Sequence, residues 1–326
     1  VRRLPLQSHE GMILYSTIII RADMPEGRYL SEKASLYVPF FVAVLLVSLV
    51  ILVLPYDTVY VRDRTYLRAF LVTIVLCVAV FLLGTLYNIL FWMRGKGLVT
   101  SPEKRLLGLV WRAARLVLSR MFAKALAVFL RDALYLSKLK GRSLTRWFMH
   151  LMILGGFLLM FALDLLVTLS MDILGYSPMI DEGGWAKLWV RDFGFELAGA
   201  MMLVGLLVAA ARRFALRPKM VRTELPDAAS ILFLLAVVLG GFVLEAMGIA
   251  GGIPGHTIDQ EYSFLGYAIS LALPASSAEW YDAAWLVHGV MSALLIAYIP
   301  FSKLFHMIAT PIAIELEGLM SEEARL

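Results

Sequence analysis

Long runs of apolar residues, separated by short charged stretches, dominate the chain. Each run reaches the roughly 20 residues that an α-helix needs to cross the hydrocarbon core of a bilayer. Lipid offers no partners to backbone amides, and a helix satisfies these groups internally. The pattern therefore predicts an all-α fold, a polytopic membrane helix bundle with about six transmembrane helices. The six runs are residues 36–55, 68–93, 146–170, 190–211, 228–249 and 283–308.

The composition agrees with a membrane protein and restricts its cofactors. Of the 326 residues, 60% are hydrophobic and 17% are charged, against about 25% charged residues in soluble domains. The single cysteine, Cys77, lies in the middle of the second run. One cysteine excludes internal disulfides, cysteine-ligated iron–sulfur clusters within the chain and covalently attached c-type haem.

Lysine and arginine are distributed unevenly among the connections between the runs. Residues 94–146 carry 13 basic residues and residues 212–227 carry five, whereas residues 250–282 carry none. Because basic connections stay on the cytoplasmic side, we expect a multi-pass protein of the cytoplasmic (inner) membrane with both termini cytoplasmic. The turn 56–67, which holds two arginines, is then expected outside and conflicts with this rule.

The runs and their connections divide the chain into five parts. The connection 94–145 mixes apolar and basic residues near helical spacing, which is typical of amphipathic helices in the membrane interface. A dock for a cytoplasmic subunit is a second, compatible interpretation. The parts are a cytoplasmic N-terminal arm (1–35), two transmembrane helices (36–93), the basic connection (94–145), a four-helix core (146–310) and a cytoplasmic tail (311–326).

Two histidines on the last run provide the main chemical signal. His288 and His306 are 18 residues apart, so a continuous helix would present both on one face, about 27 Å apart. His150, at the start of the third run, is expected at the same depth as His306. Imidazoles facing each other across helices are typical axial ligands of haem iron, and Gly155-Gly156 would leave room for the macrocycle. The alternatives are interhelical hydrogen bonds or a proton path.

His288 is expected in the outer leaflet, and its axial partner is harder to identify. Met160 follows His150 by ten residues, about 15 Å deeper, and methionine sulfur can ligate haem opposite histidine. Methionine also fills gaps in apolar cores, so packing is the alternative interpretation. We expect at least one haem b, at the inner histidine pair, and a second at His288 and Met160. The basic side chains of Arg146 and Lys303 are candidates for pairing with haem propionates.

Charged side chains cluster near the outer ends of the third and fourth runs. Asp164, Glu196 and Lys187 lie there, and acidic groups beside a redox centre could accept protons from a quinol as it is oxidised. The alternative is helix-end charge in the headgroup region, which would account for Lys187 and Asp192. We interpret His256, in a turn of the outer connection, as a solvated loop histidine.

The spacing of these residues resembles the di-haem cytochrome b subunit (gamma subunit) of respiratory nitrate reductase. The motif is a span with His150 and a residue ten further on, followed by a last span with His288 and His306. The resemblance implies that His150 and His306 hold the inner haem, and that Met160 and His288 hold the outer haem. Met160 departs from that family, which has histidine there. The resemblance covers residues 146–310.

The additional N-terminal span and the basic loop look more like the membrane subunit of the sulfite-reduction-associated Dsr complex (DsrM, also called HmeC). They also resemble the related membrane subunit of heterodisulfide reductase. These families imply a quinol-oxidising electron-transfer subunit of an oxidoreductase complex, without a sulfur- or nitrogen-reducing active site of its own. Menaquinone is the implied membrane carrier, and a cytoplasmic iron–sulfur subunit is the implied partner, with further membrane and outer-side redox subunits. The alternatives are a proton-coupled transporter or channel, and a structural anchor without cofactors.

Overall fold

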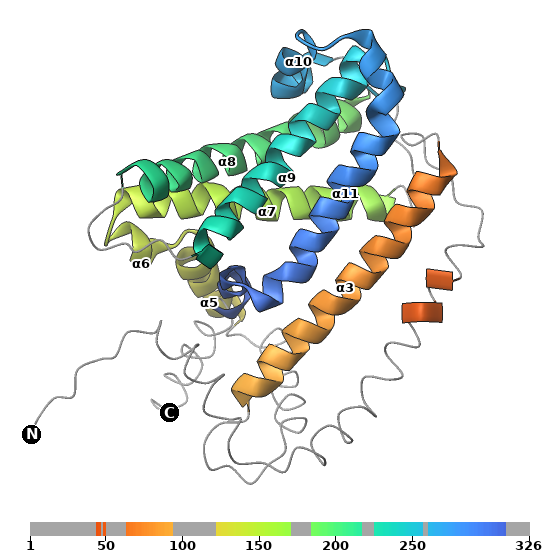
Figure 1. Ribbon diagram of the computed structural model, residues 1–326. Coiled ribbons are helices and arrows are strands. Elements are labelled where there is room, and N and C mark those ends of the chain that lie inside the picture. Colours follow the sequence, from red (N-terminus) through yellow and green to blue (C-terminus); the bar gives the residue numbers. More distant parts are fainter. Residues whose placement is uncertain are drawn as a thin grey trace, which may run out of the picture. The chain divides into compact units, whose positions relative to one another are not determined.

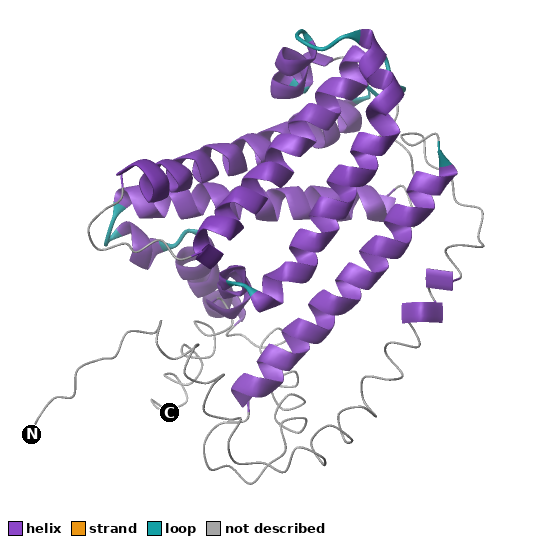
Figure 2. Ribbon diagram, viewed as in Figure 1, coloured by secondary structure: helices purple, strands orange, loops and turns teal. Residues whose placement is uncertain are grey.

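A computed structural model shows the described residues as helices joined by loops and turns (Figure 2). No strand occurs among the residues that the structure describes, which are given at the end of this paragraph. The predicted all-α fold is therefore confirmed. The chain forms two compact units, 1–54 and 55–326, and the helices named below belong to the second. The predicted first span, 36–55, lies mostly outside the described residues. The structure describes residues 44–46, 48–49, 63–93, 122–170, 184–216, 225–256 and 260–310.

Five helical segments of the described chain are long and apolar enough to cross a membrane, which confirms a multi-pass protein. In two of these segments, a regular α-helix is flanked by π-helical or 3₁₀ turns. Residues 186–216 contain α8 (Phe193–Ala210), and residues 275–301 contain α11 (Tyr281–Tyr298). The other three are α3 (Arg64–Met93), α7 (Leu144–Thr168) and α9 (Leu225–Ala250).

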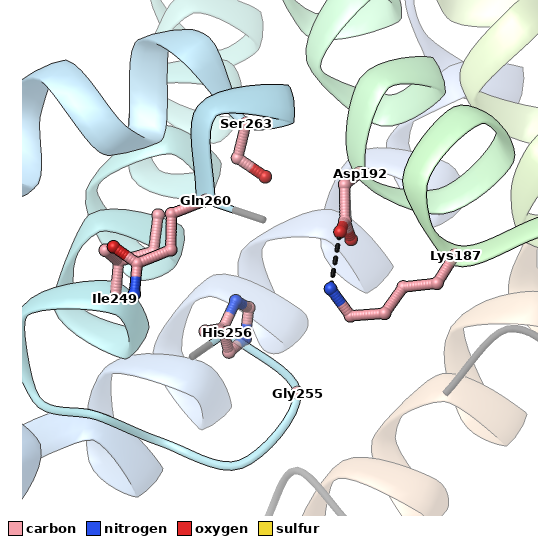
Figure 3. Close-up of a pocket in the computed structure, with 7 residues that line it drawn as sticks. All are labelled: Lys187, Asp192, Ile249, Gly255, His256, Gln260 and Ser263. Carbon is pink, nitrogen blue, oxygen red and sulfur yellow. Dashed lines mark hydrogen bonds and ion pairs between the residues drawn. The ribbon is translucent and has the colours of Figure 1, made fainter. Parts of the chain in front are cut away.

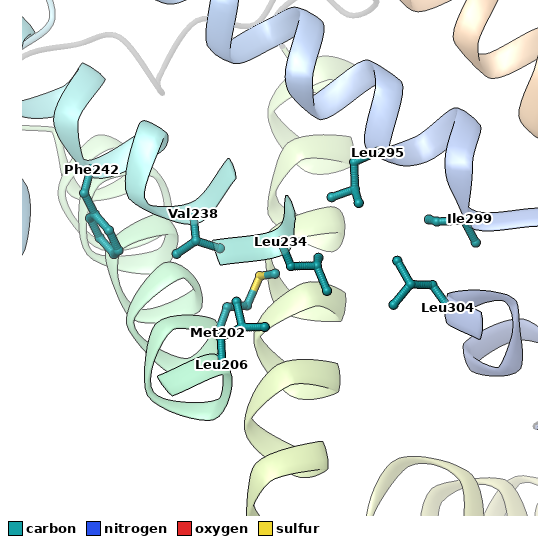
Figure 4. Close-up of a cluster of buried hydrophobic side chains, with 8 residues drawn as sticks. All are labelled: Met202, Leu206, Leu234, Val238, Phe242, Leu295, Ile299 and Leu304. Atoms are coloured by element: carbon teal, nitrogen blue, oxygen red, sulfur yellow. The ribbon is translucent and has the colours of Figure 1, made fainter. Parts of the chain in front are cut away.

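The helices α7, α8, α9, α11 and α3 pack one against the next in that order (Figure 1). α8 is the most enclosed, with 39% of its most apolar stretch buried inside the protein, against 6% for α7. A buried apolar cluster joins α8, α9 and the end of α11 (Figure 4). The cluster consists of Met202, Leu206, Leu234, Val238, Phe242, Leu295, Ile299 and Leu304.

Glycines let α7 and α8 approach closely. A Cβ atom on Gly156 would lie 2.6 Å from the Ala198 carbonyl oxygen, and one on Gly205 would lie 2.9 Å from the Ile153 amide nitrogen. Small residues at such crossings are typical of membrane helix pairs. A Cβ atom on Gly155 would also meet α8, at Met201. The space expected for a cofactor at Gly156 is therefore filled by the backbone of α8, whereas Gly155 meets only the end of the Met201 side chain.

The last run is not one continuous helix. α11 ends at Tyr298, and short 3₁₀ turns follow at Ile299–Phe301 and Lys303–Phe305, separated by an extended Ser302 (φ −121°, ψ 173°). Pro300 has no amide hydrogen to continue the helical ladder. The argument that His288 and His306 share one helix face is therefore wrong, because the helix is broken between them.

The described part of the basic connection consists of short helices that are interrupted at residues 135–136 and again at residues 141–143, before α7. α5 (Phe122–Val128) continues through wider turns to Leu134, and α6 (Ser137–Lys140) follows. Asp132 is buried there and accepts hydrogen bonds from Arg131 and Ser137, which lower the pKa of Asp132 to about 2. This ionic contact stabilises the turn that leads into α7.

The connection between α9 and α11 folds back onto the bundle. α10 (Phe264–Ser270) is a single short helix that packs against α9 and α8 (Figure 1). Pro274 follows it, and the 3₁₀ turns at Ala275–Trp280 then lead into α11. The connection thereby covers one end of the α8–α9 pair with polar side chains that are described below.

Candidate functional site

His150 and His306 make the same local hydrogen bond. The Nδ1 atom of His150 lies 2.8 Å from the Arg146 carbonyl oxygen, and the Nδ1 atom of His306 lies 2.5 Å from the Lys303 carbonyl oxygen. A carbonyl oxygen can only accept, so each Nδ1–H donates and each Nε2 keeps its lone pair. This tautomer, oriented by a backbone carbonyl, is the one that metal-ligating histidines use.

The two histidines belong to the same end of the bundle. His150 lies in the second turn of α7, close enough to interact electrostatically with His306, Arg212 and Arg146. Arg212 follows the end of α8, so three separate segments converge there. The side chain of His306 is exposed, and that of His150 is half-buried. The chemistry of His150 and His306 therefore fits the role of two axial ligands of one haem.

The expected propionate partners differ in their surroundings. Arg146 is exposed in the first turn of α7, where its backbone amide donates to the Ser143 hydroxyl. The ammonium group of Lys303 lies 3.0 Å from the Asp227 carboxylate at the start of α9, and Arg213 bonds the same carboxylate. Asp227 therefore already balances part of the positive charge beside His306, which the sequence pattern did not indicate.

His288 lies in the middle of the bundle against α9. A Cβ atom on Gly240 would lie 3.2 Å from its Nδ1 atom, and one on Gly241 would lie 3.4 Å from its Cε1 atom. Nδ1 is buried and has no hydrogen-bond partner among the described residues. Met160 lies half-buried on α7. The ring of His288 thus lies against two glycines and has a buried nitrogen without a hydrogen-bond partner, which fits a ligand-binding role for this histidine.

The opposite end of the bundle from His150 and His306 holds a buried ion pair. Lys187 is only 1% exposed, and its ammonium nitrogen lies 2.6 Å from the Asp192 carboxylate. The pair lines a small pocket with side chains from the outer connection (Figure 3). Lys187 and Asp192, for which helix-end charge was the alternative interpretation, are thus buried and paired with each other. The pocket is lined by Lys187, Asp192, Ile249, Gly255, His256, Gln260 and Ser263.

Two further carboxyl groups lie next to this pocket, and one expected residue does not join them. Glu196 is 1% exposed and accepts the backbone amide hydrogens of Leu265 and Gly266, at 3.2 and 2.9 Å. Glu245, on α9, packs against Gly266, where a Cβ atom would lie 2.8 Å from the Glu245 Cγ atom. Asp164, by contrast, has an exposed side chain on α7. The structure thus brings Lys187 and Glu196 to one region and adds Glu245.

His256 is enclosed rather than solvated, so its interpretation as a solvated loop histidine is wrong. A Cβ atom on Gly248 would lie 2.8 Å from its ring, and its Nε2 atom lies 3.3 Å from the Tyr281 hydroxyl oxygen. Burial lowers the pKa of His256 to about 3, with further lowering by the charges of Arg191 and Lys187. Nothing in the local sequence signals this burial, since the contacts come from α9 and α11.

These features define a multi-pass, all-α membrane protein with two histidines whose Nδ1 atoms bond backbone carbonyl oxygens, and with a separate cluster of buried acids and bases. Residues 184–317 match the family model of the nitrate reductase gamma subunit. The match includes His288, His306, Glu196 and Lys187 but not His150, Met160 or Asp164.

Curated relatives extend the similarity. The chain is 28% identical over 255 residues to a subunit of the dihydromethanophenazine:CoB–CoM heterodisulfide reductase of Methanosarcina barkeri, covering 73% of this chain and 87% of the relative. The same subunit of the Methanosarcina mazei enzyme is 29% identical over 252 residues, with 73% and 88% covered. An EtfAB:quinone oxidoreductase of Syntrophomonas wolfei is 25% identical over 253 residues, which cover 72% of this chain but 31% of that protein.

No solved structure shows significant similarity to the chain. The family match and the relatives together support a membrane electron-transfer subunit of the cytochrome b type, related to the heterodisulfide reductase membrane subunit. They support a role within a redox enzyme complex rather than alone.

Proposed function

We propose that the chain is a di-haem cytochrome b subunit that transfers electrons between menaquinol and a cytoplasmic iron–sulfur subunit. The observation that carries this proposal is the matched pair of His150 and His306, each with Nδ1 bound to a backbone carbonyl oxygen. Hydrogen-bonded interhelical histidines would use both nitrogens within the protein, whereas this arrangement leaves both Nε2 lone pairs for a metal.

His150 and His306 would hold the inner haem, and His288 with Met160 would hold the outer haem. A bound haem supplies one-electron redox chemistry at each position. The Gly240–Gly241 pair leaves room for the His288 ring to stay close to α9. Arg146, Arg212 and Lys303 provide positive charge around the inner pair, which suits propionate carboxylates.

The quinol would be oxidised near the other end of the bundle. Glu196 and Lys187 are the residues of this chain that we assign to proton handling there, and Asp164 is a third candidate on α7. Lys187 and Asp192 form a buried pair, and an ion pair out of water is costly unless it is well bonded. Its position beside a polar pocket suggests a functional role.

The partner is inferred from charge and from the relatives. Residues 94–146 hold 13 basic residues, which suit a dock for an acidic surface of an iron–sulfur subunit. The names of the relatives include a heterodisulfide reductase and a quinone oxidoreductase, which suits electron transfer between a membrane carrier and a redox partner. The link to a sulfite-reduction-associated Dsr complex, and an inner-membrane location with both termini cytoplasmic, are part of this proposal.

A pyridine haemochrome assay with a reduced-minus-oxidised spectrum on the purified full chain tests the proposal. Two b-type haems per chain are expected. One haem would support the inner pair and contradict the assignment of His288 and Met160. A chain purified with its partner subunits and still without haem would overturn the proposal. The buried acids and His256 would then favour a proton-coupled transporter.

A further inference from the structure

The carboxylate of Asp227 joins three segments of the chain. Asp227 lies in the first turn of α9, and its two oxygens bond the guanidinium group of Arg213 and the ammonium group of Lys303. Arg213 lies in the helical turns that follow α8, and Lys303 begins the 3₁₀ turn Lys303–Phe305. One acidic side chain therefore ties together the end of α8, the start of α9 and the turn that leads to His306.

This contact is largely shielded from water. The exposed fraction of the side chain is 16% for Asp227 and 19% for Arg213, and the Lys303 nitrogen lies 3.0 Å from the carboxylate. An isolated, exposed ion pair contributes little to stability, whereas a shielded carboxylate bonded by two bases holds its partners more firmly. The start of a helix also favours a negative charge. Asp227 is therefore suited to hold the Lys303 side chain in one place.

Lys303 connects this carboxylate to His306 through its own backbone. The Lys303 carbonyl oxygen accepts the Nδ1 hydrogen of His306, with 2.5 Å between the two heavy atoms. The side chain of the same lysine is bonded to Asp227. A carbonyl bond of this kind orients an imidazole ring, so a single residue links the carboxylate to the direction in which the His306 ring points.

The turn that carries Lys303 is not part of a continuous α-helix. α11 ends at Tyr298, and Ser302 is extended (φ −121°, ψ 173°) between two short 3₁₀ turns. Leu304 belongs to the buried apolar cluster and holds one side of the turn (Figure 4). Apolar packing is not directional, so it resists withdrawal of the turn better than rotation. The bond from Lys303 to Asp227 is directional and limits that rotation.

We propose that Asp227 is a positioning residue for His306, acting through Lys303 to fix the direction of the imidazole Nε2 atom. The proposal rests on the proposed function for what this nitrogen meets, which is the iron of the inner haem. Asp227 acts indirectly: its carboxylate holds the Lys303 ammonium group, and the Lys303 carbonyl oxygen holds Nδ1–H. Loss of the carboxylate should therefore change the orientation of the His306 ring without removing it as a ligand.

Redox potentials and the low-spin ferric EPR signal of the full chain in lipid nanodiscs separate positioning from charge. Asp227→Asn removes a negative charge and Lys303→Met removes a positive one. A role through charge alone would shift the inner haem potential in opposite directions and leave its EPR signal unchanged, and this result overturns the proposal. Positioning predicts the same shift of the EPR signal in both variants, because this signal depends on the angle between the two imidazole planes. The double variant should shift it no further than either single variant.

Matched variants keep this test interpretable. Asp227→Glu should restore the wild-type EPR signal, because it keeps the carboxylate. Lys138→Met removes an exposed lysine before α7 and should leave the signal unchanged. Lys303→Met carries the test if Asp227→Asn does not assemble, because the Lys303 side chain is 52% exposed and Asp227 keeps Arg213 as a partner. A wild-type signal in Lys303→Met overturns the proposal.

Hydrogen exchange tests the contact without reference to haem. In Asp227→Asn, the backbone amides of the turn before His306 should exchange at least about tenfold faster than in the wild type, the fold-change that one charge-assisted hydrogen bond contributes. Glu261→Gln, at an exposed position far along the chain, should leave this exchange unchanged. Wild-type exchange in Asp227→Asn overturns the positioning role. A chain without haem refutes the proposed function alone, and the exchange rate then decides whether Asp227 fixes the turn.

Discussion

The side-chain amide of Asn88 donates a 2.7 Å hydrogen bond to the backbone carbonyl oxygen of Pro300, 212 residues further along the chain. The bond joins α3 to the break that ends α11. Gly84, one turn earlier on α3, allows the same approach, because a Cβ atom there would lie 2.8 Å from both Pro300 and Phe301. α3 therefore fixes the place where the chain turns toward His306.

Replacing Asn88 should disturb the inner haem more than the outer haem. Asn88→Ala leaves the Pro300 carbonyl without its partner, which costs about 1–3 kcal/mol for a buried group. We expect a lower melting temperature and a shifted midpoint potential for the haem at His150 and His306. Leu82→Ala, at a position 50% exposed on the same helix, is the control. An inner haem with unaltered potential would show that the break holds without Asn88.

The α7–α8 contact should tolerate a methyl group at one glycine but not at its neighbour. Gly156→Ala places Cβ against the backbone of α8, whereas Gly155→Ala meets only the flexible end of Met201. Overpacking of this kind costs about 1–3 kcal/mol, so Gly156→Ala should lower the melting temperature in detergent. Gly155→Ala is the matched control. Equal melting temperatures for the two variants would contradict the close approach.

The haem assignments predict separate losses for the two histidines of the last segment. His306→Ala should remove the inner haem and leave the outer one, and His288→Ala should do the reverse, as measured by haem content and redox difference spectra. His9→Ala, in the N-terminal arm outside the described residues, is the control. Survival of both haems in His306→Ala would exclude the proposed inner pairing.

The identity of the outer ligand is tested by Met160→His. Histidine in place of a thioether lowers haem potential, and we expect a decrease of more than about 59 mV, a tenfold change in a one-electron equilibrium. The inner haem should keep its potential and so provides an internal reference. A constant outer potential in a titration of the variant would mean that Met160 only packs.

His256 should make stability depend on pH under acidic conditions. Its pKa is lowered to about 3 in the folded protein, from 6.5 ordinarily, chiefly by burial. Between about pH 6.5 and pH 3, His256 is protonated in the unfolded chain but neutral in the folded chain. The free energy of unfolding therefore decreases as the pH drops through this window and does not change above it. His256→Gln should flatten this part of a melting-temperature profile, and His9→Gln should not. A profile that keeps its slope in His256→Gln would contradict the burial of this histidine.

The spans follow from the sequence because lipid imposes simple rules. A helix must satisfy its own backbone, so apolar length alone locates α3, α7, α8 and α9 to within a few residues. Burying an imidazole in such a segment costs free energy, which makes His150 and His288 candidates for a functional site from the sequence alone.

Only the tertiary structure decided how these residues are used. The break after Tyr298 depends on Pro300 together with Asn88 from a distant helix, so helical periodicity across it was misleading. The burial of His256 and the hydrogen bonds from Leu265 and Gly266 to Glu196 arise because the connection between α9 and α11 folds back over α8 and α9. Hydropathy and spacing are local properties and determined the spans, whereas contacts between side chains far apart in the sequence are set by packing.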